Sequence, residues 1–293
     1  MTDAIPILDG IGGAASRYRA AILDLWGVIH NGVAAFPAAV ACLARFRAAG
    51  IRTVLLSNAP RRSTEVVRRL EELGVPRSAY DAIVTSGDLT RAALERRDDP
   101  AHGGLGRRYF RLGPERDWGL VEGLDYDVVP DLAGATFIVA TGLFDDDRET
   151  VADYDAFLAE ALERGLPMIC ANPDLEVQRG TRLVLCAGAL AKAYEARGGR
   201  VVYHGKPYAA AYAACFALFA GIAKEAVFAV GDSLKTDIAG ANRAGIDGYL
   251  VASGIHGAEL GLGPGGPLDG AKLAAACRAH GVRPAAALAR FIW

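Results

Sequence analysis

Short, continuous runs of apolar residues recur along the chain, and each ends in polar residues. Strands of a parallel sheet have this pattern, because helices cover both faces of the sheet and neither face needs polar side chains. Four such runs stand out, at Ala20–Leu23, Thr53–Leu56, Val201–Tyr203 and Ala226–Val230. We therefore expect these segments to be buried parallel strands.

Amphipathic segments alternate with these runs. Helical spacing predicts helices over 37–49, 61–73 and 236–244, and a glycine follows each of them as a stop signal. Strands that alternate with helices are typical of α/β proteins. The pattern therefore predicts an α/β fold whose core is a doubly wound, Rossmann-like parallel sheet.

A long insertion separates the second apolar run from the third. The gap is about 145 residues, far more than one crossover between parallel strands needs. It carries its own α/β pattern, with strands expected at 107–110, 136–140 and 166–171 and a helix at 151–164. We expect an inserted α/β cap domain over 84–186 and a core formed by 1–83 and 187–293.

Composition narrows the class of protein. The 293 residues hold 32 Lys and Arg against 34 Asp and Glu, a net charge of −2, which does not favour a nucleic-acid or membrane-surface partner. Five scattered cysteines without a C-x-x-C pair, and no secretory signal, favour the cytoplasm. The longest apolar stretch, 209–223, is too short to span a bilayer and predicts a buried helix. The sequence leaves open whether the protein forms a homo-oligomer.

Reactive side chains follow the predicted strands. Asp24, Ser57, Lys206 and Asp232 would meet where the carboxyl ends of parallel strands gather, which is where such sheets bind ligands. The Asp24 carboxylate can attack phosphorus and form an aspartyl-phosphate. Ser57 and the backbone N–H of Asn58 can hold phosphoryl oxygens, and Lys206 adds a positive charge. This set fits the binding of a phosphorylated small molecule.

Two of the acids lie five residues apart. Asp232 and Asp237 belong to Gly-Asp-Ser-Leu-Lys-Thr-Asp, and hard oxygen ligands of this kind suit Mg²⁺. Phosphoryl transfer depends mainly on positioning and charge neutralisation, which these groups can supply. Taken singly, each residue also has an ordinary role as a helix cap, a turn residue or a surface charge. Their order along the chain favours phosphoryl transfer.

Four segments carry a family resemblance. The chain resembles the haloacid dehalogenase (HAD) superfamily of phosphohydrolases, subclass IIA, in Asp24–Gly32, Leu56–Arg62, Gly205–Pro207 and Gly231–Asp237. The resemblance implies Mg²⁺-dependent hydrolysis of phosphate esters through an aspartyl-phosphate on Asp24. It also implies Ser57 and Lys206 as phosphate ligands, Asp232 as a metal ligand and Asp237 as support for the metal site.

One position departs from the family pattern. The family usually has a second aspartate two residues after the nucleophile, as general acid and base, and this chain has Trp26. The backbone carbonyl of Trp26 could still bind the metal. The substrate could have a good leaving group, His30 or Asp174 could donate the proton, or hydrolysis could be weak.

The segment Ala171-Asn-Pro-Asp174 resembles a motif at the end of the inserted cap in this subclass. Asn172 and Asp174 are accordingly candidates to contact the leaving group, and an Asx-Pro turn is the alternative. We expect a Mg²⁺-dependent phosphohydrolase of a small metabolite, such as a sugar, nucleotide, aryl or acyl phosphate. Trp26 leaves two alternatives: a metabolite-binding or regulatory protein with weakened catalysis and, with a hydroxyl acceptor, a phosphotransferase.

Overall fold

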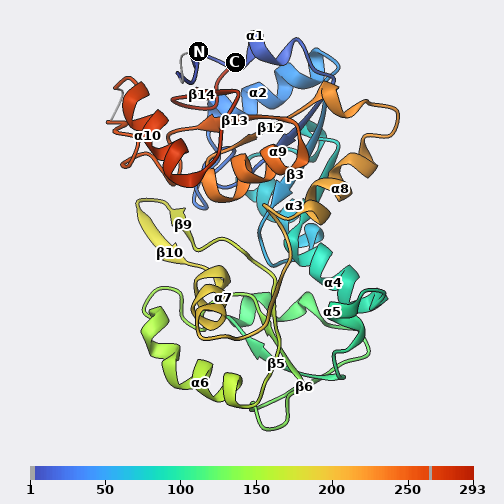
Figure 1. The fold of residues 1–293 in the computed structure, drawn as a ribbon. Coiled ribbons are helices and arrows are strands. Elements are labelled where there is room, and N and C mark those ends of the chain that lie inside the picture. The colour runs from blue at the N-terminus through green and yellow to red at the C-terminus, as the bar shows by residue number, and fades with distance from the viewer. Residues whose placement is uncertain (1–3, 264–265) are drawn as a thin grey trace.

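Two parallel sheets organise the molecule, which is a computed structural model that describes residues 4–263 and 266–293. The larger sheet has the order β1-β14-β13-β12-β2-β3-β4, and all its neighbouring strands are parallel. Its strands are β1 (Ile7–Leu8), β2 (Ala20–Leu23), β3 (Arg52–Ser57), β4 (Ala82–Thr85), β12 (Val227–Gly231), β13 (Asp247–Val251) and β14 (Ala286–Leu288). This sheet defines the first unit, which also holds both ends of the described chain (Figure 1).

Helices cover both faces of the larger sheet. Along β2, Ala21 and Leu23 face one apolar cluster while Ala20 and Ile22 face another, so the whole strand is apolar. One face packs on α1 (Gly12–Ala15), α2 (Pro37–Ala48) and α3 (Ser63–Glu72), and the other on α8 (Ala209–Leu218), α9 (Ala239–Ala244) and α10 (Gly270–His280). The predicted doubly wound α/β core is therefore confirmed.

The second unit is built on a smaller parallel sheet of order β11-β8-β7-β5-β6 (Figure 1). Its strands are β5 (Arg108–Leu112), β6 (Asp127–Val129), β7 (Phe137–Ala140), β8 (Met168–Cys170) and β11 (Val201–Tyr203). Its helices are α4 (Ser86–Arg96), α5 (Pro100–Gly103), α6 (Asp155–Glu163) and α7 (Ala187–Ala196). An antiparallel hairpin, β9 (Glu176–Arg179) and β10 (Arg182–Leu185), extends from this unit toward the first.

One expected strand lies in the other sheet. Val201–Tyr203 was expected in the core sheet, but it pairs in parallel with β8 as the edge of the smaller sheet. The helix before it, α7, also packs into the second unit through Leu190 and Tyr194. The expectation for this strand was wrong, because its apolar pattern fits either sheet. We propose that the inserted unit ends after Tyr203 rather than at 186.

The helix expected at 236–244 has a modified first turn. A π-helical turn at Leu234–Ile238 precedes α9, and the Ser233 side chain caps it by accepting from the N–H of Thr236. The stretch 209–223, expected to be a buried helix, is helical only in α8 (Ala209–Leu218), and its buried face is formed by Ala211, Tyr212 and Cys215. No helix among the described residues is long and apolar enough to cross a membrane.

Candidate active site

Three neighbouring strands of the larger sheet end at the candidate site. Asp24 follows β2, Asn58 follows β3 and Asp232 follows β12, and these strands are adjacent in the order β12-β2-β3. The backbone approaches closely here: Gly27 has φ = +75°, and a Cβ on it would overlap the Asp232 side chain. Glycine is needed at this turn for both reasons.

Lys206 reaches the same point from the second unit. It follows β11 by way of His204 and Gly205, and its ammonium donates hydrogen bonds to Asp24 Oδ1 and, at 2.8 Å, to Asp237 Oδ1. The Lys206 side chain is only 3% exposed. Burial alone would lower the pKa of Lys206, but the carboxylates of Asp237 and Asp24 raise it well above its usual range. Lys206 is therefore a fixed positive charge.

Three carboxylates share this buried space. Oxygens of Asp24, Asp232 and Asp237 lie within 4.8 Å of one another. Burial raises the pKa of Asp24 well above its usual range, an effect that Lys206 opposes and Asp237 and Asp232 reinforce. Burial, with Asp237 next, raises the pKa of Asp232 to about 8. These raised pKa values reflect three acids that repel one another around a single ammonium, and a bound hard cation would relieve that repulsion in place of protons.

The predicted phosphate-binding pair is well ordered by hydrogen bonds. Asn58 Oδ1 accepts from the backbone N–H of Lys206 at 2.7 Å, and its Nδ2 donates to Asp174 Oδ1 at 2.9 Å. Ser57 Oγ accepts from the N–H of Ala59 at 3.1 Å. Asn58 therefore joins the first unit to both the lysine and the Asp174 loop.

The two candidates from the second unit differ. Asn172 uses its side-chain oxygen to accept from the N–H of Asp174 at 3.0 Å, which is the Asx turn considered above. Asp174 reaches Asn58 across the boundary between the units. Burial raises the pKa of Asp174, while Lys206 and Asn58 oppose the rise. Asp174 is therefore a carboxyl group held close to the lysine.

Trp26 lines the same cavity as the three acids. Its ring meets the His30 ring edge to face, with centroids 5.2 Å apart, and packs closely on Gly32. The buried Trp26 Nε1 donates to no hydrogen-bond acceptor in the described part of the chain. His30 Nδ1 accepts from the N–H of Gly32 at 3.0 Å, and burial, with Arg69 next, lowers the pKa of His30 to about 4.

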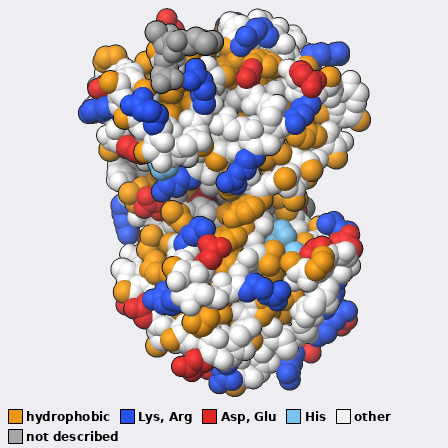
Figure 2. Space-filling model, in the orientation of Figure 1, with side chains coloured by type: hydrophobic (Ala, Val, Ile, Leu, Met, Phe, Trp, Pro, Cys, Tyr) orange, Lys and Arg blue, Asp and Glu red, His pale blue; other side chains and the backbone are white. Residues whose placement is uncertain are grey.

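A cavity of about 800 Å³ opens over these groups. The first unit contributes Asp24, Trp26 and Asp232 to its lining, and the second unit contributes Asp174 and the β9–β10 hairpin. Figure 2 shows the two lobes joined at a narrower waist, the level at which the two units face each other. The cavity is large enough for a small phosphorylated metabolite.

Some cavity residues were missed by the sequence analysis. The hairpin could have been found, because Glu176–Leu185 shows two extended runs around the turn Gly180–Thr181. His256 and Glu259, which also line the cavity, lie in turns after β13 and carry no local pattern. Only the folded structure brings these two residues to the cavity.

Fold and site together define an α/β protein with a buried carboxylate–lysine centre at the carboxyl ends of parallel strands. The sequence model of haloacid dehalogenase-like hydrolases matches residues 21–127, and a HAD-hydrolase-like model matches residues 203–267. Comparison with curated proteins finds no match.

Solved structures extend the similarity to the whole chain. A hydrolase of the haloacid dehalogenase-like family from Brucella suis 1330 is 38% identical, with a TM-score of 0.84, over 97% of this chain and 100% of that one. A possible sugar phosphatase from Cytophaga hutchinsonii shares the fold at 20% identity, with a TM-score of 0.76 over 97% of each chain. A glycerol phosphate phosphatase from Mycobacterium tuberculosis, in complex with magnesium, is 26% identical, with a TM-score of 0.62 over 82% of this chain and 69% of that one. The chain belongs to the haloacid dehalogenase-like hydrolase family.

Proposed function

We propose that this protein is a Mg²⁺-dependent phosphatase of a small phosphorylated metabolite, of subclass IIA. One observation carries the proposal: Asp24, Lys206, Asp232 and Asp237 gather in one buried cluster beneath a cavity of about 800 Å³. The similar glycerol phosphate phosphatase, described in complex with magnesium, supports both the substrate class and the metal.

The donor set fits Mg²⁺. Its side-chain atoms are carboxylate oxygens, the hard ligands that this ion prefers, and three acids crowd around a single lysine. Asp24 and Asp232 would hold the ion, together with the Trp26 backbone carbonyl, and Asp237 would support them. The ion would neutralise charge on the transferring phosphoryl group.

The chain's own residues would then divide the chemistry. The Asp24 carboxylate attacks phosphorus, the bond to the leaving oxygen breaks, and an aspartyl-phosphate forms. Lys206 lies against Asp24 and holds the phosphoryl oxygens, together with Ser57 and the N–H of Asn58. Water then attacks the phosphorus, releases phosphate and restores Asp24. The second unit lies over the cavity and would limit the access of bulk water, which would strengthen these charge interactions.

A second function follows from Trp26. An indole donates a hydrogen bond but transfers no proton under ordinary conditions, so the protein could bind a phosphorylated ligand and hydrolyse it poorly. The location of Trp26 on the cavity wall favours this candidate. Both functions use the same pocket and differ in turnover.

One assay tests both. Wild type, Asp24→Asn and Trp26→Asp are compared with Mg²⁺ on a panel of sugar, nucleotide, glycerol and aryl phosphates. We expect hydrolysis by the wild type to fall to background in Asp24→Asn, because the amide is no nucleophile. Equal turnover of these two proteins would exclude the covalent mechanism. A large gain in Trp26→Asp over a nearly inactive wild type would favour the binding protein.

A further inference from the structure

Two loops at the site hold each other through reciprocal hydrogen bonds. The N–H of Ile255 donates to Asp232 Oδ2 at 2.9 Å, and the N–H of Leu234 donates to His256 Nε2 at 3.1 Å. The loops follow β12 and β13, which are neighbours in the sheet. They pack so closely that a Cβ on Gly254 would overlap the Asp232 side chain. The loop after β13 therefore fixes the loop that carries Asp232 and Asp237.

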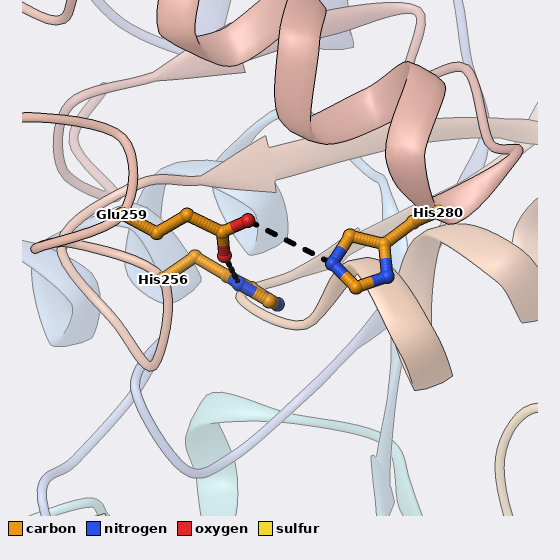
Figure 3. Close-up of side chains that lie close together, drawn as sticks. All are labelled: His256, Glu259 and His280. Carbon is orange, nitrogen blue, oxygen red and sulfur yellow. Dashed lines mark hydrogen bonds and ion pairs between the residues drawn. The ribbon is translucent and has the colours of Figure 1, made fainter.

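The acceptor role of His256 determines where its proton lies. Because Nε2 accepts from a backbone N–H, the neutral ring carries its proton on Nδ1. Nδ1 lies 2.6 Å from Glu259 Oε2 and can donate to it. Burial lowers the pKa of His256, which favours this neutral form, although Glu259 opposes the shift. Figure 3 shows the Glu259 carboxylate between the rings of His256 and His280.

The same three side chains could be taken for a zinc site. Ligand atoms of His256, Glu259 and His280 lie within 4.8 Å of one another, and His280 Nε2 is 3.8 Å from Glu259 Oε1. However, a metal-bound histidine normally donates its other ring N–H to an acceptor. If Nδ1 of His256 bound a metal, its Nε2–H would face the N–H of Leu234, and two donors would oppose each other. The hydrogen bonds therefore argue against a metal here.

We propose that His256, oriented by Glu259, is a positioning residue for the loop 232–237, and that it keeps Asp232 aligned for the metal ion. The inference rests on the proposed Mg²⁺ site. His256 acts through its hydrogen bond with the Leu234 backbone. Glu259 sets the tautomer that makes Nε2 an acceptor, so the pair works as one unit.

The test uses the full-length protein and two readouts besides activity. Calorimetric titration with Mg²⁺ gives its dissociation constant, and amide hydrogen exchange reports the protection of Leu234 and Ile255. We expect His256→Ala to weaken Mg²⁺ binding about tenfold or more, the usual effect of removing an outer-shell partner. Both amides should exchange faster. His256→Gln should keep most of the affinity, because its side-chain oxygen can accept from Leu234.

His280→Ala is the matched control, because His280 belongs to the cluster but makes no contact with the loop 232–237 in the hydrogen bonds of the described residues. It should bind Mg²⁺ as the wild type does. Equal losses in His256→Ala and His280→Ala, with Zn²⁺ binding that both variants abolish, would overturn the proposal in favour of a metal site. Wild-type Mg²⁺ affinity and exchange in His256→Ala would also overturn it.

Glu259→Ala keeps the proposal testable if His256→Ala does not fold. It should raise the Mg²⁺ dissociation constant and speed exchange at Leu234, and unchanged values would count against the pair. Failure of the proposed function looks different, since the wild type itself would then bind no Mg²⁺. In that case, unchanged exchange at Leu234 and Ile255 in the variants would still refute the positioning role, and faster exchange would support it.

Discussion

The missing aspartate at Trp26 leaves two side chains to compare as proton donors. Burial lowers the pKa of His30 to about 4, so His30 is uncharged near neutral pH and is a poor general acid. Asp174 is a carboxyl whose pKa burial raises, and it faces the cavity beside Asn58 and Lys206. A raised pKa brings a carboxyl closer to the working pH of a general acid. We infer that Asp174 protonates the leaving group.

Asp174→Asn should therefore act according to the leaving group. An alkoxide needs a proton to depart, whereas a nitrophenolate does not. We expect kcat to fall by roughly 10²–10⁴ on an alkyl phosphate and far less on 4-nitrophenyl phosphate. Steady-state rates on the two substrates measure the difference. His30→Gln is the control and should affect both alike. Equal losses on both substrates in Asp174→Asn would mean that Asp174 only shapes the pocket.

At the scale of single residues, the sequence predicted the charged centre but not His256, whose hydrogen bond holds the loop behind it. Asp24 and Lys206 were expected to converge, and Asp237 was expected at the metal site; hydrogen bonds join Lys206 to both acids. Asp24 and Asp232 follow neighbouring strands of the larger sheet, and strand ends in a parallel sheet have a common location. Lys206 follows β11 of the smaller sheet, so this argument does not account for its approach. His256 was not predicted, because its partner Leu234 is 22 residues away and the contact depends on the packing of two loops. Local patterns carry no record of such a contact.

Among the elements, β11 shows where pattern-based prediction ends. Val201–Tyr203 has the apolar character of a parallel strand, which the structure confirms, yet it pairs with β8 rather than with the core sheet. Both sheets are parallel and need the same residue types, so three apolar residues cannot specify their partner. The β9–β10 hairpin was missed although its turn was visible. The long gap between apolar runs predicted an inserted unit, but the residues at which that unit ends depend on how its strands and helices pack.

The segment after β11 carries a buried histidine that ties it to α5. His204 Nε2 lies 3.0 Å from His102 Nε2, and His102 Nδ1 lies 2.7 Å from Asp99 Oδ2. Burial, with His102 next, lowers the pKa of His204 to about 4. Protonation of His204 would place a positive charge against the His102 ring, which is already hydrogen-bonded to Asp99. The native state therefore prefers the neutral form.

This preference makes folding stability sensitive to acid. Above pH 6.5, His204 is neutral in both states and adds no pH dependence. Between pH 6.5 and 4, the unfolded chain binds the proton and the native state does not, so stability falls as the pH falls. The loss approaches about 3 kcal/mol for a shift from 6.5 to about 4. Below pH 4, the contribution is constant.

His204→Gln should remove this share of the pH dependence. Urea unfolding at pH 7.5 and pH 5 should show a smaller difference in the free energy of unfolding than in the wild type. The variant keeps an amide that can donate to His102, so the fold should tolerate it. Another buried histidine, His30, titrates in the same direction, and His30→Gln should remove a separate share. An unchanged difference in His204→Gln would contradict the assignment.

In the whole molecule, contacts across the cavity hold the two units together. Arg61 Nε lies 2.6 Å from Asp117 Oδ1, and the N–H of Gly180 in the hairpin turn donates to Asn31 O at 3.0 Å. Asn58 and Asp174 add a third link, beside the lysine. The Asp117 side chain is 3% exposed, and that of Arg61 is 35% exposed. Water therefore reaches the arginine of this ion pair but hardly reaches the Asp117 carboxylate.

Arg61→Ala should destabilise the closed molecule more than its neighbour Arg62→Ala. Without Arg61, the Asp117 carboxylate is buried and unpaired, and we expect a loss of about 2 kcal/mol, between the values for exposed and buried pairs. Arg62 pairs with Asp88 at 2.7 Å, with both side chains about a third exposed, so its loss should be about 0–1 kcal/mol. Urea unfolding at pH 7.5 measures both, and KM should rise only in Arg61→Ala.

The stability lost in Arg61→Ala should depend on pH if the loss is electrostatic. Burial already raises the pKa of Asp117, with Arg61 opposing the rise, so removal of Arg61 lets the pKa climb further. The carboxyl can then be protonated instead of buried as a charge, and the variant should lose less relative to the wild type at pH 5 than at pH 7.5. Asp117→Asn, which leaves no buried carboxylate behind, should show no such recovery. A loss in Arg61→Ala that is equal at both pH values would mean that the arginine acts by packing across the cavity and that charge pairing does not hold the units closed.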